Sequence, residues 1–148
     1  LAAAIALIGT AFDLLDGMVA RKYNKVTQFG ALLDSTMDRI SDFLIISSFG
    51  FSGIVRWELV APILLLSFLI SYVRSRGEGI THNVSFAVGM MERTERLILI
   101  FIGFVCYLFF PKLVTSNFNL AEIIFMISLI LSLLTVIQRI LFAYKKLN

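Results

Sequence analysis

The stretch DLLDGMVARKYNKVTQFGALLDSTMD, residues 13–38, places acidic side chains at fixed intervals in a chain that is otherwise strongly apolar. Its spacing is D-x2-D-G-x2-A-R-x8-G-x3-D-x3-D, and the eight residues of this pattern are Asp13, Asp16, Gly17, Ala20, Arg21, Gly30, Asp34 and Asp38. A carboxylate in an apolar environment is destabilising unless a cation or hydrogen bonds offset its charge. Four carboxylates at regular spacing therefore indicate a functional site that binds a cation.

The composition of the chain indicates a membrane protein. Of its 148 residues, 59% are hydrophobic and 16% are charged, which is more apolar than a typical soluble domain. Each charge-free run is shorter than the ~20 residues that cross a bilayer as a helix, so each helix must include flanking polar residues. We expect one all-α polytopic membrane domain over residues 1–148, with helices at about 1–20, 31–54, 58–75, 93–110 and 119–143.

Basic residues gather on one side of the predicted bundle. Ten of the thirteen Lys and Arg residues follow the first predicted helix, frame the link between the third and fourth, or close the chain. Because such residues accumulate on the cytoplasmic side of a membrane, this side, which also carries the aspartates, is expected to face the cytoplasm of a prokaryotic cell whose plasma membrane holds the protein. The basic residues do not alternate with stacking aromatics along a polar face, so we expect membrane lipid and anionic substrates as partners and no nucleic acid.

Helical spacing explains the intervals of the pattern. Asp13, Gly17 and Ala20 fall on one stripe of the first helix, and Asp16 lies beside that stripe. On the second helix Gly30, Asp34 and Asp38 again share one face. The loop between these helices is short enough for the two acidic faces to oppose each other. Oxygen ligands without nearby His or Cys suit a hard cation such as Mg2+ or Mn2+.

The eight-residue pattern resembles the signature of the CDP-alcohol phosphotransferase family, membrane enzymes that move a phospho-alcohol from a CDP carrier to an acceptor hydroxyl. The resemblance implies six helices, of which this chain would contain five and lack the first. It also implies that Asp13, Asp16 and Asp34 bind the metal and that Asp38 is the general base while also near a metal. In the CDP-donor site, Gly17, Ala20 and Gly30 would make room for the cytidine diphosphate beside Asp13, with Arg21 at the rim. We also expect a homodimer.

The segments 71–78 and 89–96 resemble the branch of this family that makes phosphatidylinositol phosphate or its archaeal ether-lipid equivalent. In that branch the acceptor is inositol 1-phosphate. The resemblance implies that its phosphate is held by Arg74, Arg93, Arg96 and Arg139. Fixed guanidinium groups suit this task because they form forked hydrogen bonds with phosphate oxygens.

Alternative interpretations remain for the same residues. The acceptor could be glycerol 3-phosphate, serine or free inositol, the donor could be CDP-inositol, and the arginines could be cytoplasmic membrane anchors. Close helix packing is an alternative role for the glycines. Buried acids also line cation transporters, although no ionisable residue is expected at mid-depth in the last three helices.

Overall fold

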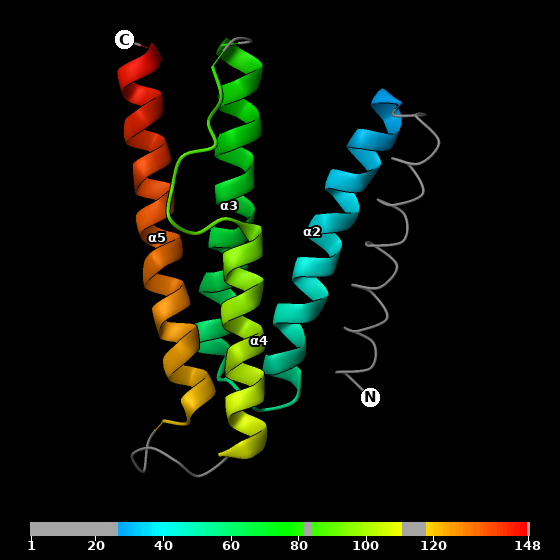
Figure 1. The fold of residues 1–148 in the computed structure, drawn as a ribbon, viewed down its shortest axis with the longest axis vertical. Coiled ribbons are helices and arrows are strands. Elements are labelled where there is room, and N and C mark those ends of the chain that lie inside the picture. Colours follow the sequence, from blue (N-terminus) through cyan, green and yellow to red (C-terminus); the bar gives the residue numbers. More distant parts are fainter. Residues whose placement is uncertain (1–26, 82–83, 111–117, 148) are drawn as a thin grey trace. The chain divides into compact units, whose positions relative to one another are not determined.

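The structure, a computed structural model, describes residues 27–81, 84–110 and 118–147, and all its regular elements there are α-helices. They are α2 (Gln28–Phe51), α3 (Trp57–Thr81), α4 (Arg93–Phe109) and α5 (Leu120–Leu147) (Figure 1). The predicted all-α class is confirmed. The predicted helix at 1–20 lies outside the described residues, so the count of five helices stays a prediction. The chain forms two compact units, residues 1–48 and 49–148.

In the first unit, α2 begins three residues earlier than predicted because Thr27 caps it. The backbone N–H of Gly30 donates to Thr27 Oγ1 at 3.0 Å, and the N–H of Ala31 donates to the Thr27 carbonyl at 3.1 Å. A threonine hydroxyl in this position satisfies one of the N–H groups that a helix start leaves without a partner. Thr27 therefore sets where α2 begins.

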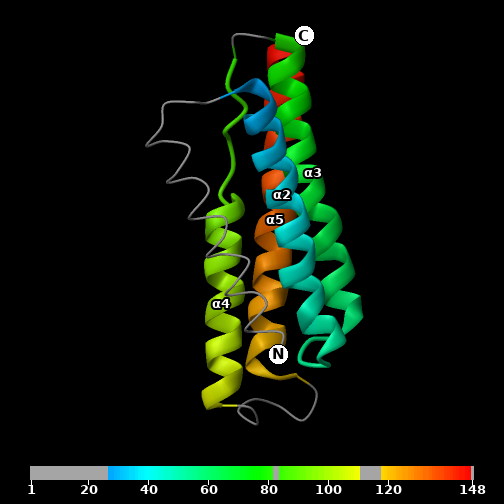
Figure 2. The ribbon, with the colours of Figure 1, turned by 90° about the vertical axis from the view of Figure 1, so that its right-hand side faces the viewer.

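In the second unit, α3 and α5 run in the same direction and α4 runs opposite to both (Figures 1 and 2). A link segment, residues 84–92, returns from the end of α3 along α5 to the start of α4. Two of its apolar side chains, Phe86 and Met91, are fully buried. The ring of Phe86 meets Phe142 of α5 edge-on at 5.3 Å between centroids. The link is thus part of the packed core.

Helix α3 ends at Thr81 and not near residue 75, so the predicted end was wrong. The sequence Gly77-Glu78-Gly79 reads as the start of a polar loop, because glycine disfavours helix. In the structure both glycines are helical, and a Cβ on Gly77 would lie 2.6 Å from the Phe86 ring. The missing side chain makes room for the link, which is why a glycine stands inside this helix.

The outer surfaces of these helices are apolar. Leu65, Phe101, Ile130 and Leu141 are all more than half exposed, while Ile63, Phe125 and other side chains fill the interior. Within the described residues, α3 and α5 are the two helices long and apolar enough to cross a membrane. Helices satisfy their own backbone hydrogen bonds, as a lipid environment requires. The architecture is that of a membrane helical bundle.

A polar cluster lies at the end of the second unit where α3 and α5 begin. Arg56 Nε donates to Glu122 Oε1 at 2.9 Å, and its guanidinium lies 4.5 Å from the Phe118 ring centroid. Asn119 Nδ2 donates to the Ile54 carbonyl at 2.7 Å. These contacts tie the turn before α3 to the first turn of α5.

Candidate active site

Two of the four signature aspartates lie on α2, in the first unit. Asp34 and Asp38 follow Gly30 at intervals of four residues and so share one face of the helix. Asp34 is exposed and Asp38 is partly buried. Asp38 Oδ2 lies 3.7 Å from Arg39 Nη2, a long ion pair between adjacent residues. Asp42, one turn further, is buried.

The other half of the signature lies outside the described residues: Asp13, Asp16, Gly17, Ala20 and Arg21. Across the described ranges no group of three or more His, Cys, Asp or Glu side chains could hold a metal ion by itself. The pair on α2 supplies carboxylate oxygens only, which fits Mg2+ or Mn2+ and not a thiolate- or imidazole-seeking metal. A metal held by Asp34 and Asp38 would need further oxygen ligands.

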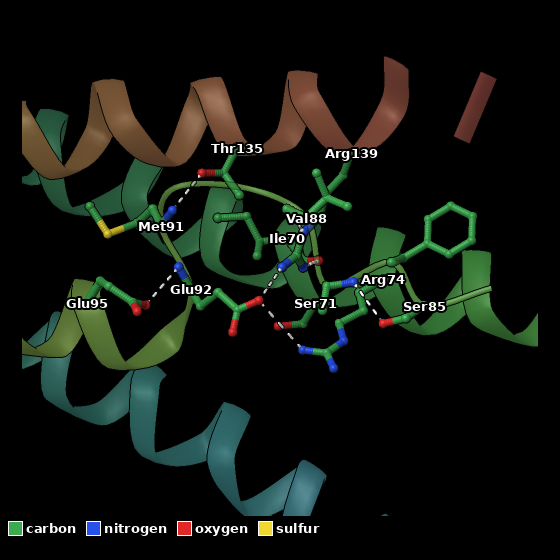
Figure 3. Close-up of polar contacts among 12 residues, drawn as sticks. Ile70, Ser71, Arg74, Ser85, Val88, Met91, Glu92, Glu95, Thr135 and Arg139 are labelled. Atoms are coloured by element: carbon green, nitrogen blue, oxygen red, sulfur yellow. Dashed lines mark hydrogen bonds and ion pairs between the residues drawn. The ribbon is translucent and has the colours of Figure 1, made fainter. Parts of the chain in front are cut away.

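In the second unit, three helices meet where α4 begins. We call Arg74, Arg93, Arg96 and Arg139 the arginine group; Arg74 comes from α3, Arg93 and Arg96 from the first turn of α4, and Arg139 from α5. Figure 3 shows Arg74 and Arg139 pointing from their helices toward Glu92, the residue before Arg93. The structure therefore brings together residues that lie up to 65 positions apart in the sequence, from Arg74 to Arg139 (139 − 74 = 65).

Arg139 is anchored by three hydrogen bonds. Its side chain is 2% exposed; Nε donates to the Val88 carbonyl at 2.7 Å, Nη1 to the Ile70 carbonyl at 2.6 Å, and Nη2 to Glu92 Oε1 at 3.2 Å. A guanidinium has five N–H donors, so these bonds leave two. Arg139 fixes the link to both α3 and α5, and it has limited capacity for a ligand.

Arg74 is more accessible and lies between two carboxylates. Its side chain is 42% exposed; Nε donates to Glu78 Oε1 at 3.2 Å and Nη1 lies 3.8 Å from Glu92 Oε1. Glu78 Oε1 also accepts the backbone N–H of Phe86 at 3.1 Å. The same carboxylate thus orients the arginine and holds the link.

The remaining two arginines occupy the start of α4. Arg96 is 1% exposed and Arg93 is partly buried. Glu92 and Glu95 form a capping box at this end, in which the backbone N–H of Glu92 donates to Glu95 Oε2 at 3.1 Å. The dipole of a helix favours negative charge at its start. Cationic side chains at this position strengthen that preference.

Sequence reasoning did not identify the residues that organise this region. The i, i+4 spacing of Glu92 and Arg96 predicts only a local ion pair, whereas the contacts of Glu92 with Arg139 and Arg74 join three helices. The sequence also gives no sign of the role of Thr135, whose Oγ1 accepts the backbone N–H of Met91 at 3.0 Å. The available signal was the Glu92–Glu95 spacing, which is typical of a capping box. The long-range contacts have no local signature.

Comparisons with known proteins agree with this architecture. Across its full length the chain is 40% identical to the archaetidylinositol phosphate synthase of Pyrococcus horikoshii, of which it spans 72%. Crystal structures of Mycobacterium tuberculosis phosphatidylinositol phosphate synthase match 91% of the chain. The form with CDP-DAG bound has a TM-score of 0.72 at 30% identity, covering 68% of that chain. The form in complex with manganese and citrate has a TM-score of 0.73 at 29% identity, covering 65%.

Together, the fold and these comparisons define the class of protein, which is a membrane-embedded, all-helical transferase. The profile of the CDP-alcohol phosphatidyltransferase family matches residues 1–138. The chain belongs to this family and is therefore an enzyme, which confirms the resemblance drawn from the eight-residue pattern.

Proposed function

We propose that this protein transfers a phosphatidyl or archaetidyl group from a CDP-lipid to the hydroxyl of inositol 1-phosphate and releases CMP. The observation that carries the proposal is the complete signature in residues 13–38, in a member of this family. The arginine group supports the choice of acceptor, because fixed cations are suited to hold the phosphate of a phosphorylated acceptor. The synthase names of the relatives in Pyrococcus horikoshii and Mycobacterium tuberculosis support the same choice.

The four aspartates would have different roles in the reaction. Asp13, Asp16 and Asp34 hold Mg2+ or Mn2+, with Asp38 close to it. The manganese in the Mycobacterium tuberculosis enzyme supports this cofactor. The ion supplies charge stabilisation at the pyrophosphate. Asp38 accepts the proton of the acceptor hydroxyl as the acceptor oxygen bonds to the lipid-bearing phosphorus, and the bond from that phosphorus to the CMP oxygen breaks.

Other residues would bind the donor and the acceptor. Gly17, Ala20 and Gly30 leave space for the cytidine diphosphate, and Arg21 lies at its rim. Arg74, Arg93 and Arg96 hold the acceptor phosphate. Arg139 joins them with the two N–H donors that Val88, Ile70 and Glu92 leave.

The distribution of basic residues supports a proposal for the location and orientation of the protein in the cell. The protein resides in the plasma membrane of a prokaryote with the active site toward the cytoplasm, where soluble inositol 1-phosphate and anionic lipid headgroups occur. Two copies form a homodimer. Crosslinking in native membranes checks this last point, and a single band at the monomer mass at all crosslinker doses would contradict it.

One experiment tests the activity directly. Purified protein in detergent with Mg2+ receives a CDP-lipid, carrying either diacylglycerol or archaeol tails, and one of four acceptors: inositol 1-phosphate, free inositol, glycerol 3-phosphate or serine. We expect CMP release to be fastest with inositol 1-phosphate and to stop when the metal is chelated. Preference for another acceptor would reassign the branch. Absence of CMP release with every acceptor would contradict the proposed activity.

A further inference from the structure

Glu92 lies where the three helices that carry the arginine group meet. Its Oε1 is 3.2 Å from Arg139 Nη2 on α5 and 3.8 Å from Arg74 Nη1 on α3 (Figure 3). Glu92 itself is the N-cap of α4. One carboxylate therefore touches two of the four arginines and precedes the other two in the chain.

We propose that Glu92 is a positioning residue for the acceptor: it holds the Arg74 guanidinium in the orientation that receives the phosphate and does not itself touch the substrate. The inference rests on the function proposed above and deepens it. Arg139 serves as the fixed end of the chain of contacts from Arg139 through Glu92 to Arg74.

The two arginines differ in how firmly they are held. Arg139 is 2% exposed and bound to two backbone carbonyls, so its side chain has little rotamer freedom. Arg74 is 42% exposed, and an exposed arginine side chain must lose rotamer freedom before it binds a ligand. Glu78 at Nε and Glu92 at Nη1 restrict that freedom in advance. Such preorganisation increases affinity without adding a contact to the ligand.

A carboxylate near a phosphate site also repels the phosphate. In a Glu92 variant, the loss of this repulsion must therefore be weighed against the loss of Arg74 orientation. Two guanidinium groups lie within 4 Å of Glu92 Oε1, and they offset most of its charge at the distance of a ligand. Neutralising Glu92 would remove one of the two carboxylates that hold Arg74, and it would also remove the ion-pair partner of Arg139. Loss of orientation is therefore expected to outweigh loss of repulsion.

Glu95 provides a matched control. It lies one turn further along α4, is exposed, and accepts the backbone N–H of Glu92 without an ion pair to any arginine within the described part of the chain. Glutamine preserves a capping box at this position. The variant Glu95→Gln thus removes the same charge from the same helix start and leaves Arg74 and Arg139 held.

The experiment compares Glu92→Gln, Glu95→Gln, Arg74→Gln and the double variant Glu92→Gln/Arg74→Gln as full chains with Mg2+ in detergent. In Glu92→Gln we expect KM for inositol 1-phosphate to rise about five- to tenfold, while kcat and the KM of the CDP-lipid stay within about twofold. Glu95→Gln stays within about twofold throughout. Because Glu92 acts through Arg74, Glu92→Gln adds less than about twofold in the Arg74→Gln background.

Each other outcome overturns the inference. An unchanged or lowered acceptor KM in Glu92→Gln means that repulsion dominates or that Arg74 needs no holder. Equal losses in kcat and donor KM mark a merely structural role, and full additivity in the double variant means that Glu92 does not act through Arg74. If Glu92→Gln fails to fold, Glu78→Gln carries the same prediction through Arg74 Nε. A wild-type enzyme that does not use inositol 1-phosphate refutes the proposed function itself, before any variant is compared.

Discussion

At the scale of single residues, Asp34 and Asp38 differ although they have the same chemistry and lie one turn apart on α2. Asp34 is exposed, and Asp38 is partly buried next to Arg39. Equivalent spacing in the sequence thus gives the two carboxylates unequal surroundings. The proposed division of roles assigns metal binding to Asp34 and proton transfer to Asp38.

We predict that Asp38→Asn keeps metal-dependent binding of the CDP-lipid and lowers kcat by about 10²- to 10⁴-fold, the range over which a general base contributes. Asp34→Asn should weaken donor binding itself, because a neutral amide is a poor ligand for a hard cation. Calorimetric titration of the donor with Mg2+, together with CMP release, separates the two effects. Normal turnover in Asp38→Asn would refute its assignment as the base.

At the scale of secondary-structure elements, two glycines in α3 offer a direct test of how the link is seated. A Cβ at Gly77 would lie 2.6 Å from the fully buried ring of Phe86, whereas a Cβ at Gly79 meets nothing within 4 Å. The two positions share one helix and lie two residues apart, so helix propensity contributes equally to both. They differ only in what packs against them.

We predict opposite effects of alanine at these two positions. Gly79→Ala should stabilise the protein by about 0.5–1 kcal/mol, because alanine favours helix over glycine. Gly77→Ala should destabilise it by about 1–2 kcal/mol, because forcing a methyl group against a packed ring outweighs the gain in propensity. Thermal unfolding of both variants in the same detergent measures the difference. Similar stabilisation in both variants would show that the Phe86 ring does not pack against Gly77.

At the scale of the whole molecule, the topology follows from the length of α3. Its 25 residues extend about 37 Å at 1.5 Å per residue, enough to place its two ends on opposite sides of a bilayer. The exposed residue Ser52 lies before its start, and the exposed Ala87 lies in the link after its end. Lys146 closes α5, which runs parallel to α3 (Figure 1).

We predict that, in a Cys106→Ala background, a cysteine at Ser52 reacts with an impermeant thiol reagent in intact cells. Cysteines at Ala87 and Lys146 should react only after the cells are opened, because the basic side faces the cytoplasm. Detergent-solubilised protein, in which all three positions react, serves as the control. Labelling of Ala87 and Lys146 in intact cells would reverse the orientation of the active site.

The family, the all-α class and the approximate helices could be predicted from the sequence, because the signature and the apolar runs are patterns of residues close together in the chain. Predicted bounds were accurate for α4 and shifted for α2, where Thr27 sets the start, and for α3, where Gly77 packs against Phe86. The sequence could not predict that Arg139 anchors the link or that Glu92 joins Arg74 to Arg139. Those contacts arise between side chains from separate helices, and a charged residue at a helix end looks the same in sequence whether it faces solvent, lipid headgroups or another charge.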